Sequence, residues 1–291
     1  MTVRASVIVS TYNQPAWLEK VLWGYAHQTT RAFELIIADD GSTAETEAVV
    51  VAAARRFQLR LVHVWHEDRG FRKTAILNRA LQVAGGDYVI FSDGDCVPRW
   101  DFVATHLRLA RPWAYLSGGY LKLPRPLSER LTYADVVSGR AFDRRWLRAQ
   151  GWRPGRRRWR LLRSARWAAW FDRLTPTRAT WNGHNASTWR ELLLAVNGFD
   201  LDMGYGGEDR AIGERLRNLG VRGIQIRHRA PVLHLDHPRP YLDPAVLARN
   251  RAIRRRIRRQ REIRARQGLA ELPSEPVRVV RYDLRGGPCG A

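Results

Sequence analysis

Two carboxylates separated by one glycine follow a short apolar segment. Residues 88–91 read Tyr-Val-Ile-Phe, and Asp93, Gly94 and Asp95 come directly afterwards. The apolar run has the composition of a strand buried on both faces. At the carboxyl end of a parallel strand, two such carboxylates can hold a divalent cation that bridges the phosphates of a nucleotide. For so short a motif, a solvated Asp-Gly turn is the alternative.

A glycine-rich loop that ends in two acids is the second candidate site. The chain reads Gly-Tyr-Gly-Gly-Glu-Asp at residues 204–209, and residues 211–219 have a helical pattern. A carboxylate at the amino end of a helix, beside a loop that lets a substrate approach, can take a proton from an acceptor hydroxyl. An ordinary acidic helix start is the alternative interpretation.

The segments around the first carboxylate pair alternate between strand-like and helix-like patterns. Strands are expected at residues 4–10, 33–38, 59–65 and 87–91, and helices at residues 15–25, 43–56 and 72–84. This alternation predicts an α/β fold with a parallel sheet and helices on both faces. The first loop, residues 11–13, lacks the glycine patterns of dinucleotide-binding folds and P-loops, so side chains must hold any nucleotide.

Three ordered motifs resemble a known family. Residues 6–13, 38–43 and 86–95 are similar to the signatures of family 2 glycosyltransferases, which have the GT-A fold with its mostly parallel, Rossmann-like central sheet. Residues 204–209 resemble the segment of β-1,4-galactosyltransferases and chondroitin-polymerase-like enzymes, with Tyr205 in place of Trp. The resemblance covers about residues 3–240. It implies metal-dependent, inverting transfer from a nucleotide diphosphate sugar, most simply a UDP-sugar, to a hydroxyl of a glycan or lipid-linked glycan in cell-surface polysaccharide or lipopolysaccharide synthesis.

The resemblance places the nucleoside at the ends of the first two strands. It implies that Thr11, Tyr12 and Asn13 contact the base and ribose and that Asp40, with Asp39 as the alternative, accepts a hydrogen bond from the base. A strand-end carboxylate can accept a uracil imide hydrogen, and a tyrosine ring can cover a base face. A turn and helix cap is the alternative at the second strand.

Cations between the third strand and its helix are candidates for the diphosphate. Arg69, Arg72 and Lys73 lie in this segment, and each has a solvated side chain as its alternative. Asp93 and Gly94 are expected to contact the same part of the nucleotide sugar.

The resemblance also implies a metal site. Asp93 and Asp95 would be ligands together with His234, for which His237 is the alternative. Neutral imidazole suits a transition ion, so manganese is the expected metal and magnesium is the second choice.

The acceptor site is assigned by resemblance to the second half of the chain. Asp209 is expected to be the catalytic base, and Glu208 to bind an acceptor hydroxyl. The remaining acceptor-binding candidates are Asn185, Tyr205, Gly206 and Gly207.

These assignments predict a glycosyltransferase domain over residues 1–245 and a basic helix and tail over 246–291. The domain divides into a nucleotide-sugar-binding half (1–117) and an acceptor-binding half (118–245), which carries an insert rich in Arg and Trp at about 144–171. A basic amphipathic helix is expected at residues 249–266, followed by a loosely held tail over 272–291.

The formal net charge is +22, and two tracts, 144–166 and 249–266, contain ten arginines each. Such tracts fit an anionic membrane surface, single-stranded nucleic acid, or solvated arginines over a tryptophan core. A nucleic-acid-binding protein and an inactive glycan-binding scaffold are competing hypotheses, but neither explains the acidic motifs.

We expect a cytoplasmic protein, peripheral on the inner face of the membrane. The sequence has two distant cysteines, no long apolar segment and no signal pattern.

Overall fold

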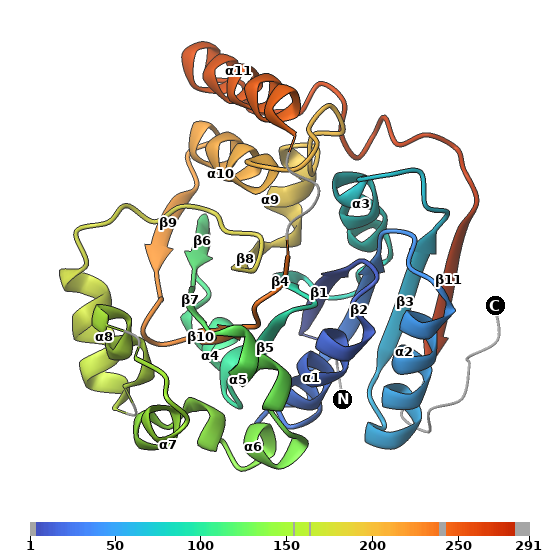
Figure 1. Cartoon of the computed structure of the whole chain (residues 1–291). Helices are drawn as coiled ribbons and strands as arrows, with labels where there is room; N and C mark the ends of the chain where they lie inside the picture. Colours follow the sequence, from blue (N-terminus) through green and yellow to red (C-terminus); the bar gives the residue numbers. More distant parts are fainter. Residues whose placement is uncertain (1–3, 154, 163, 239–242, 283–291) are drawn as a thin grey trace.

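The main sheet is mostly parallel, as the strand and helix pattern predicts. The structure is a computed structural model that describes residues 4–153, 155–162, 164–238 and 243–282. In these residues the sheet has eight strands in the order β11-β3-β2-β1-β4-β8-β6-β9 (Figure 1). The strands are β1 (Ala5–Thr11), β2 (Phe33–Asp39), β3 (Leu61–His66), β4 (Tyr88–Asp93), β6 (Ala114–Ser117), β8 (Asn185–Trp189), β9 (Arg222–Gln225) and β11 (Val277–Tyr282). β8 and β11 run antiparallel to their neighbours, and the other strands share one direction.

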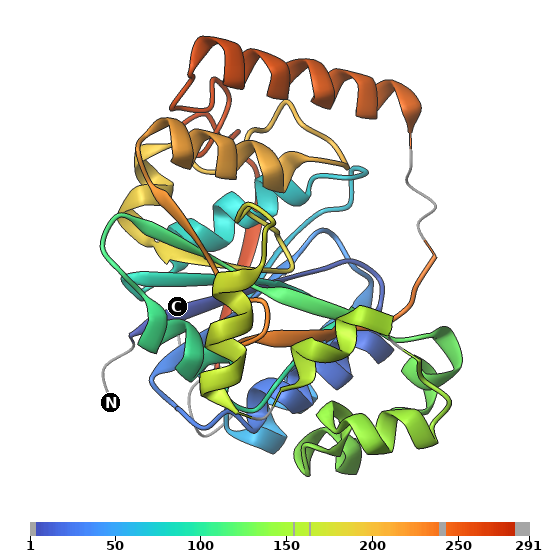
Figure 2. The same ribbon diagram turned by 90° about the vertical axis from the view of Figure 1, so that its left-hand side faces the viewer.

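Helices cover both faces of this sheet because its central strands are apolar on both sides. Along β1, Val7 and Val9 point to one face and Ile8 to the other. The valine face packs against α1 (Pro15–Ala26), α2 (Ala44–Phe57) and α4 (Phe102–Leu109). The isoleucine face packs against α3 (Lys73–Val83), α9 (Arg190–Ala195) and α10 (Glu208–Asn218) (Figure 2). The predicted α/β fold is therefore confirmed.

The register of the central strands aligns the ends that carry the candidate site. Thr11 at the end of β1 is the partner of Asp39 in β2, and Ser10 is the partner of Asp93 in β4. The loops after three strands consequently leave the sheet at the same edge, as expected for parallel strands.

A second, three-stranded sheet brings a distant segment to this edge. It consists of β5 (Cys96–Pro98), β10 (Pro231–His234) and β7 (Gly119–Lys122). His234 is the register partner of Cys96, and the Leu235 amide donates to the Asp95 carbonyl at 2.8 Å. This pairing fixes the place of His234 next to Asp95.

Short helices fill the chain between β7 and β8, the segment that contains the insert rich in Arg and Trp. They are α5 (Arg125–Arg130), α6 (Tyr133–Val137), η1 (Arg140–Phe142), α7 (Arg144–Ala149), η2 (Gly155–Leu161) and α8 (Ala165–Leu174). Trp152 is buried in the core, and Trp159 stacks on Phe171 with ring centres 5.3 Å apart. Trp167 and Trp170 on α8 are exposed instead. The tryptophans of the tract therefore divide into a packed group and a surface group.

The basic C-terminal helix is α11 (Pro244–Gln260). It begins before the predicted start at residue 249 and ends before the predicted end at residue 266. Its apolar seam, Ile253 and Ile257, packs against Met203 and Ala211. This seam is therefore covered by the protein and does not form a free apolar face. Within the described residues, no helix has the length and apolar character required to cross a bilayer.

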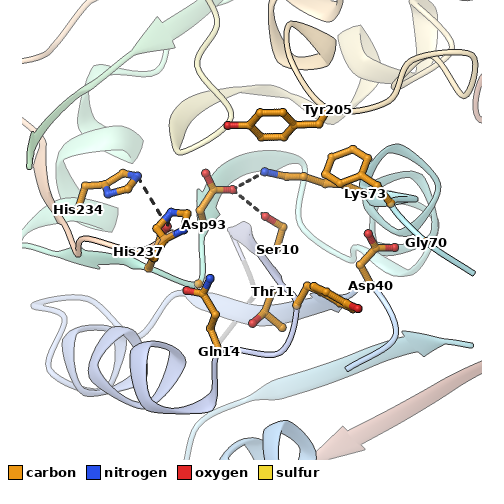
Figure 3. Close-up of a pocket in the computed structure, with 14 residues that line it drawn as sticks. Ser10, Thr11, Gln14, Asp40, Gly70, Lys73, Asp93, Tyr205, His234 and His237 are labelled. Atoms are coloured by element: carbon orange, nitrogen blue, oxygen red, sulfur yellow. Dashed lines mark hydrogen bonds and ion pairs between the residues drawn. The ribbon is translucent and has the colours of Figure 1, made fainter. Parts of the chain in front are cut away.

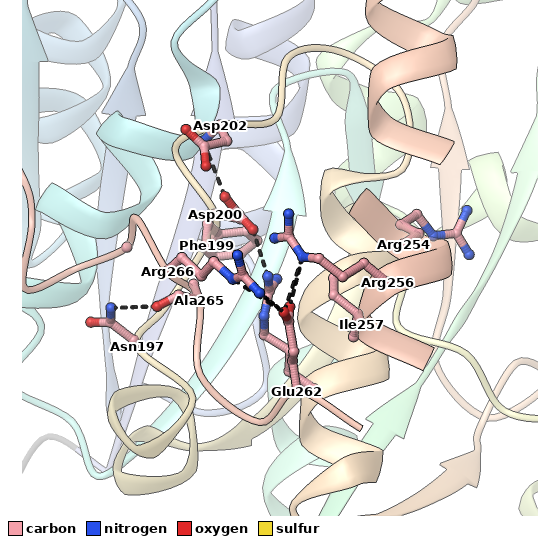
Figure 4. Close-up of polar contacts among 12 residues, drawn as sticks. Asn197, Phe199, Asp200, Asp202, Arg254, Arg256, Ile257, Glu262, Ala265 and Arg266 are labelled. Atoms are coloured by element: carbon pink, nitrogen blue, oxygen red, sulfur yellow. Dashed lines mark hydrogen bonds and ion pairs between the residues drawn. The ribbon is translucent and has the colours of Figure 1, made fainter. Parts of the chain in front are cut away.

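Ion pairs fix the chain after α11. Arg261 adopts a left-handed φ of 52°, which ends the helix. Glu262 then pairs with Arg256 of the helix at 3.0 Å and with Arg266 at 2.7 Å (Figure 4). Part of the positive charge of this tract is therefore neutralised within the protein.

The expectation of a loosely held tail over 272–291 is wrong for residues 277–282. These residues form β11, which pairs antiparallel with β3 at the edge of the main sheet. Val277, Val279 and Val280 favour a strand, and the unpaired edge of β3 supplies its partner. The rest of the predicted tail, residues 283–291, lies outside the described part of the chain.

One buried side chain of α11 holds the glycine-rich loop that precedes α10. The Asn250 amide donates to the carbonyl oxygens of Gly204, Tyr205 and Gly206 at 2.9, 3.2 and 3.1 Å. Gly206 has a φ of 103°, and a Cβ there would lie 2.3 Å from Leu247 of α11. The loop therefore depends on close contact with α11.

We expect the Asn250→Ala substitution to lower the free energy of unfolding by about 1–3 kcal/mol, because it removes the donor shared by three loop carbonyls. Urea unfolding monitored by circular dichroism measures this change. Arg255→Ala is the matched control, since it removes an exposed side chain from the same helix and should change stability by less than about 0.5 kcal/mol. Equal stability of the two variants would contradict the role of Asn250.

Candidate functional site

A cavity of about 430 Å³ opens at the carboxyl edge of the main sheet (Figure 3). Ten of the residues singled out from the sequence line it together, although they come from six separate segments. They are Thr11, Tyr12, Asp40, Lys73, Asp93, Gly94, Asp95, Tyr205, His234 and His237. The cavity is large enough for part of a nucleotide sugar, and both walls carry polar groups that could orient a ligand.

The first wall follows β1. The Thr11 hydroxyl is buried and has no hydrogen-bond partner among the described residues, so it is available to a ligand. The Tyr12 side chain is 45% exposed, and its hydroxyl donates to Asp68 at 2.8 Å. This bond to a carboxylate raises the pKa of Tyr12. Gly94 packs closely against β1, since a Cβ there would lie 3.0 Å from the Thr11 hydroxyl oxygen and 3.1 Å from the Ser10 carbonyl oxygen.

Two adjacent carboxylates at the end of β2 have different surroundings. Asp40 lines the cavity and accepts hydrogen bonds from His66 Nε2 at 2.7 Å and from the Arg72 amide at 3.0 Å. Burial raises the pKa of Asp40, and these two bonds oppose the change. Asp39 is buried behind it and accepts from the Ser42 amide and from His63. Of the two alternatives for the base contact, Asp40 is therefore the one that faces the cavity.

Lys73 and Asp93 form an ion pair at the centre of the cavity. The Lys73 ammonium lies 2.7 Å from Asp93 Oδ1, which also accepts from the Ser10 hydroxyl at 2.7 Å (Figure 3). Burial opposes both charges, but the attraction between them holds the pKa of Lys73 above and that of Asp93 below the ordinary value. Lys73 thus remains a cation that could contact a diphosphate.

Asp95 and two histidines form a cluster suited to a metal ion. One ligand atom from each of Asp95, His234 and His237 lies within 4.8 Å of the others. His237 Nε2 is 2.7 Å from Asp95 Oδ2, and His234 Nε2 is 3.7 Å from it. Burial opposes the charge of Asp95, but the bond to His237 and the two imidazoles hold its pKa well below the usual range. The carboxylate therefore stays ionised.

The backbone orients both imidazoles. His234 Nδ1 lies 2.9 Å from the Leu235 carbonyl oxygen, and His237 Nδ1 lies 2.8 Å from that of Pro238. With Nδ1–H bonded to these carbonyls, each Nε2 could give up its proton and bind a metal ion held together with Asp95, the arrangement in which histidine binds a metal. Two nitrogens and a carboxylate fit a divalent transition ion. Neighbouring Cys96 fits less well, because burial raises the pKa of its thiol far above the ordinary value.

The two acids at the start of α10 lie beside the cavity and do not line it. Asp209 Oδ2 accepts from the Gly183 amide at 3.1 Å, and Glu208 Oε2 accepts from the Gly206 amide at 2.8 Å. Burial and the charge of Asp209 raise the pKa of Glu208. The helix start stabilises negative charge at this position. The charges of both acids also raise the pKa of Lys73.

The structure places three other predicted residues away from the cavity wall. The Asn185 side chain is fully buried and donates to the carbonyl oxygens of Gly119 and Ala230, so it joins strands and exposes no group to an acceptor. Asn13 accepts from the Thr43 amide. Arg69 is paired with Glu67 at 2.8 Å on the surface.

Sequence reasoning missed four residues that line the cavity, Ser10, Gln14, Gly70 and Phe71. Ser10 and Gln14 flank the motif at residues 11–13 and could have been included on position alone. Phe71 packs edge-on against Tyr205, with ring centres 5.7 Å apart. This contact joins two loops that are far apart in the sequence, and no sequence signal indicated it.

Comparisons with known proteins agree with this geometry. Residues 6–114 match the pattern of Glycosyl transferase family 2. Validoxylamine A glucosyltransferase from Streptomyces hygroscopicus subsp. jinggangensis is 30% identical over 233 residues, which are 74% of this chain and 52% of that protein. The chain thus spans about half the length of this curated relative.

Two solved structures have the same fold. The mannosyltransferase PcManGT from Pyrobaculum calidifontis, in complex with GDP-Man and Mn²⁺, superposes with a TM-score of 0.52 at 24% identity and covers 90% of this chain and 62% of that chain. S. aureus TarS 1-349 in complex with UDP gives a TM-score of 0.55 at 17% identity and covers 86% of this chain and 64% of that chain. The resemblance noted in the sequence is confirmed: residues 6–114 belong to a family 2 glycosyltransferase domain, and the chain has the GT-A fold.

Proposed function

We propose that this chain transfers a sugar from a nucleotide diphosphate sugar, a UDP-sugar in our assignment, to a hydroxyl group of a glycan or lipid-linked glycan. One observation carries the proposal. Lys73, Asp93, Asp95 and the two histidines converge on one cavity at the carboxyl edge of a GT-A sheet. The relatives with GDP-Man and UDP bound support a nucleotide-sugar donor. Such acceptors are extended during the synthesis of cell-surface polysaccharide or lipopolysaccharide, which is the process we assign to this chain.

In this proposal the donor lies across the cavity. Thr11, Tyr12 and Asp40 hold the nucleoside, with the Tyr12 ring against the base and the Asp40 carboxylate accepting from a base N–H. Lys73 contacts the diphosphate. Asp95, His234 and His237 would hold a manganese ion, with Asp93 beside it. When bound, that ion stabilises the negative charge of the leaving diphosphate.

Asp209 is the base in this proposal. The acceptor oxygen forms a bond to the anomeric carbon of the sugar while the bond from that carbon to the diphosphate oxygen breaks. The acceptor proton passes to Asp209, and the nucleoside diphosphate leaves with the bonding electron pair. Attack from the face opposite the leaving group inverts the anomeric configuration. Tyr205, Gly206 and Gly207 form the approach for the acceptor, with Glu208 on one of its hydroxyls.

We expect Asp209→Asn to lower transfer by at least about 100-fold, because the amide cannot accept the acceptor proton. UDP affinity should stay within about twofold, since Asp209 does not line the cavity. Release of UDP from a panel of UDP-sugars with glycan acceptors measures the first effect, and calorimetry the second. Asp202→Asn, an exposed acid upstream of the same loop, is the control. A variant that transfers normally, or loses UDP binding instead, would remove Asp209 from this role.

Peripheral attachment to an anionic membrane is the proposal for localisation. α8 places Trp167, Trp170 and Leu174 on one face, with exposed fractions of 59%, 49% and 55%. Exposed arginines, Arg166 and Arg173, flank them. Tryptophan rings at headgroup depth with guanidinium groups on lipid phosphates would suit such a surface. The buried seam of α11 makes that helix a weaker candidate.

We expect the protein to float with phosphatidylglycerol vesicles at low salt, and the Trp167→Ser/Trp170→Ser variant to lose most of this binding. Trp113→Ser is a matched control, because Trp113 is also 59% exposed but lies between α4 and β6. Phosphatidylcholine vesicles should bind weakly, since they carry no net charge. Failure of the unmodified protein to float would refute membrane attachment through α8.

A further inference from the structure

Two arginines lie over the ring of Tyr120, a residue of β7 that has no part in the proposed reaction, and a third packs beside the neighbouring Gly119. The guanidinium carbons of Arg157 and Arg160 lie 5.4 and 5.8 Å from the centre of the Tyr120 ring. Arg160 also donates to the Tyr120 carbonyl oxygen. Arg227 packs on the preceding residue, where a Cβ on Gly119 would lie 2.7 Å from the Arg227 Cβ. We call these three arginines the Tyr120 cluster.

The cluster has no negative partner within the described part of the chain. No ion pair there involves Arg157, Arg160 or Arg227, and Arg227 donates to neutral side-chain oxygens. The charge of Asp172 acts on Arg227, but Asp172 is already paired with a histidine and an arginine of the segment between β9 and β10. Arg157 and Arg160 therefore share one tyrosine ring with no carboxylate paired to either among the described residues, and Arg227 adds a third positive charge close enough to act on Arg160.

Holding these charges together costs free energy. Arg160 is only partly exposed, and burial together with the charges of Arg227 and Arg157 lowers its pKa to about 10. Solvated arginines on a flexible surface would move apart, since like charges repel. Here the backbone bond of Arg160 and the contacts of Arg157 and Arg160 with the Tyr120 ring keep these two arginines close. An anion bound between them would offset this repulsion.

The cluster adjoins the acceptor side of the cavity. The Tyr120 ring packs against His184 and His234, with ring centres 4.8 and 5.7 Å apart. His234 belongs to the proposed metal site, and His184 follows Gly183, whose amide donates to Asp209. An acceptor whose hydroxyl reaches Asp209 could therefore place an anionic group on the cluster.

We propose that Arg157, Arg160 and Arg227 form a site for a phosphate group carried by the acceptor. This inference rests on the proposed function and names the acceptor class as a phosphorylated one. Planar guanidinium groups bind phosphate oxygens in pairs, and three cations match a dianion better than a single carboxylate. The donor diphosphate has its own cation, Lys73, which pairs with Asp93 and lines the cavity. Phosphate on an acceptor and phosphate in a membrane headgroup share this chemistry, and the test below separates them.

The test is calorimetric titration of glucose 1-phosphate into protein saturated with UDP and Mn²⁺, so that the donor site is filled. We expect glucose 1-phosphate to bind and glucose not to bind. Arg157→Gln and Arg160→Gln should each weaken binding by at least about tenfold, because each removes charge-assisted hydrogen bonds. Arg173→Gln, an exposed arginine of α8, is the matched control and should bind as the unmodified protein does.

UDP affinity is measured on every variant and separates this inference from the proposed function. If the unmodified protein binds UDP but not glucose 1-phosphate, only the phosphate site is overturned. If the unmodified protein does not bind UDP at all, the proposed function is overturned. Equal binding of glucuronate would overturn the assignment to phosphate, and equal weakening by Arg173→Gln would show a general charge effect. If Arg157→Gln reduces flotation with phosphatidylglycerol vesicles and leaves glucose 1-phosphate binding unchanged, the phosphate belongs to the membrane and the acceptor assignment fails.

Discussion

The site depends on two neighbouring carboxylates, Asp93 partly exposed and Asp95 buried, that need separate counter-charges. Asp93 and Asp95 are two residues apart at the end of β4, and the charge of each disfavours ionisation of the other. Lys73 compensates Asp93 from the start of α3, and His234 and His237 compensate Asp95 from the end of β10. The two carboxylates thereby divide the cavity into a cationic side and a side suited to a metal ion. α3 and the second sheet must therefore both be folded in place for the two carboxylates to remain ionised side by side.

The acceptor side depends on segments outside the residues that match the family pattern, 6–114. Asn250 of α11 holds the loop that leads to Glu208 and Asp209, and Glu262 fixes the chain where the helix ends. The insert reaches the same region through Tyr120, which contacts His234. The C-terminal helix and the insert are thus joined to the site by direct contacts. We interpret them as the parts that adapt a common donor site to a particular acceptor.

The sequence was sufficient for the α/β fold and for the segments that meet at the cavity, because strand ends and glycine-rich turns leave local patterns. It could not choose between adjacent or alternative side chains. Asp39 and Asp40 are adjacent acids, and the sequence does not show which one faces the cavity. Their side chains are held in place by His63 and His66 of the next strand. His234 and His237 could not be separated, since both reach Asp95 only through the pairing of β10 with β5.

Residues whose partners are distant in the sequence were the hardest to predict. Asn185 was an acceptor-binding candidate, yet its amide is used inside the sheet. The apolar seam of α11 has the same pattern as a membrane-surface helix, and only the presence of Met203 and Ala211 shows that it is covered. β11 formed where a loose tail was expected, because β3 offers an unpaired edge. Each error concerns tertiary contacts and not local propensity.

The most direct test of the central claim is calorimetric titration of metal-free protein with UDP and with GDP, each with and without manganese. We predict that UDP binds tightly only when manganese is present, because Asp95, His234 and His237 would hold the ion that contacts the diphosphate. GDP should bind more weakly if Asp40 and Tyr12 select the base. UDP binding of equal strength without manganese would contradict the metal site. No binding of either nucleotide under any condition would contradict the donor site as a whole.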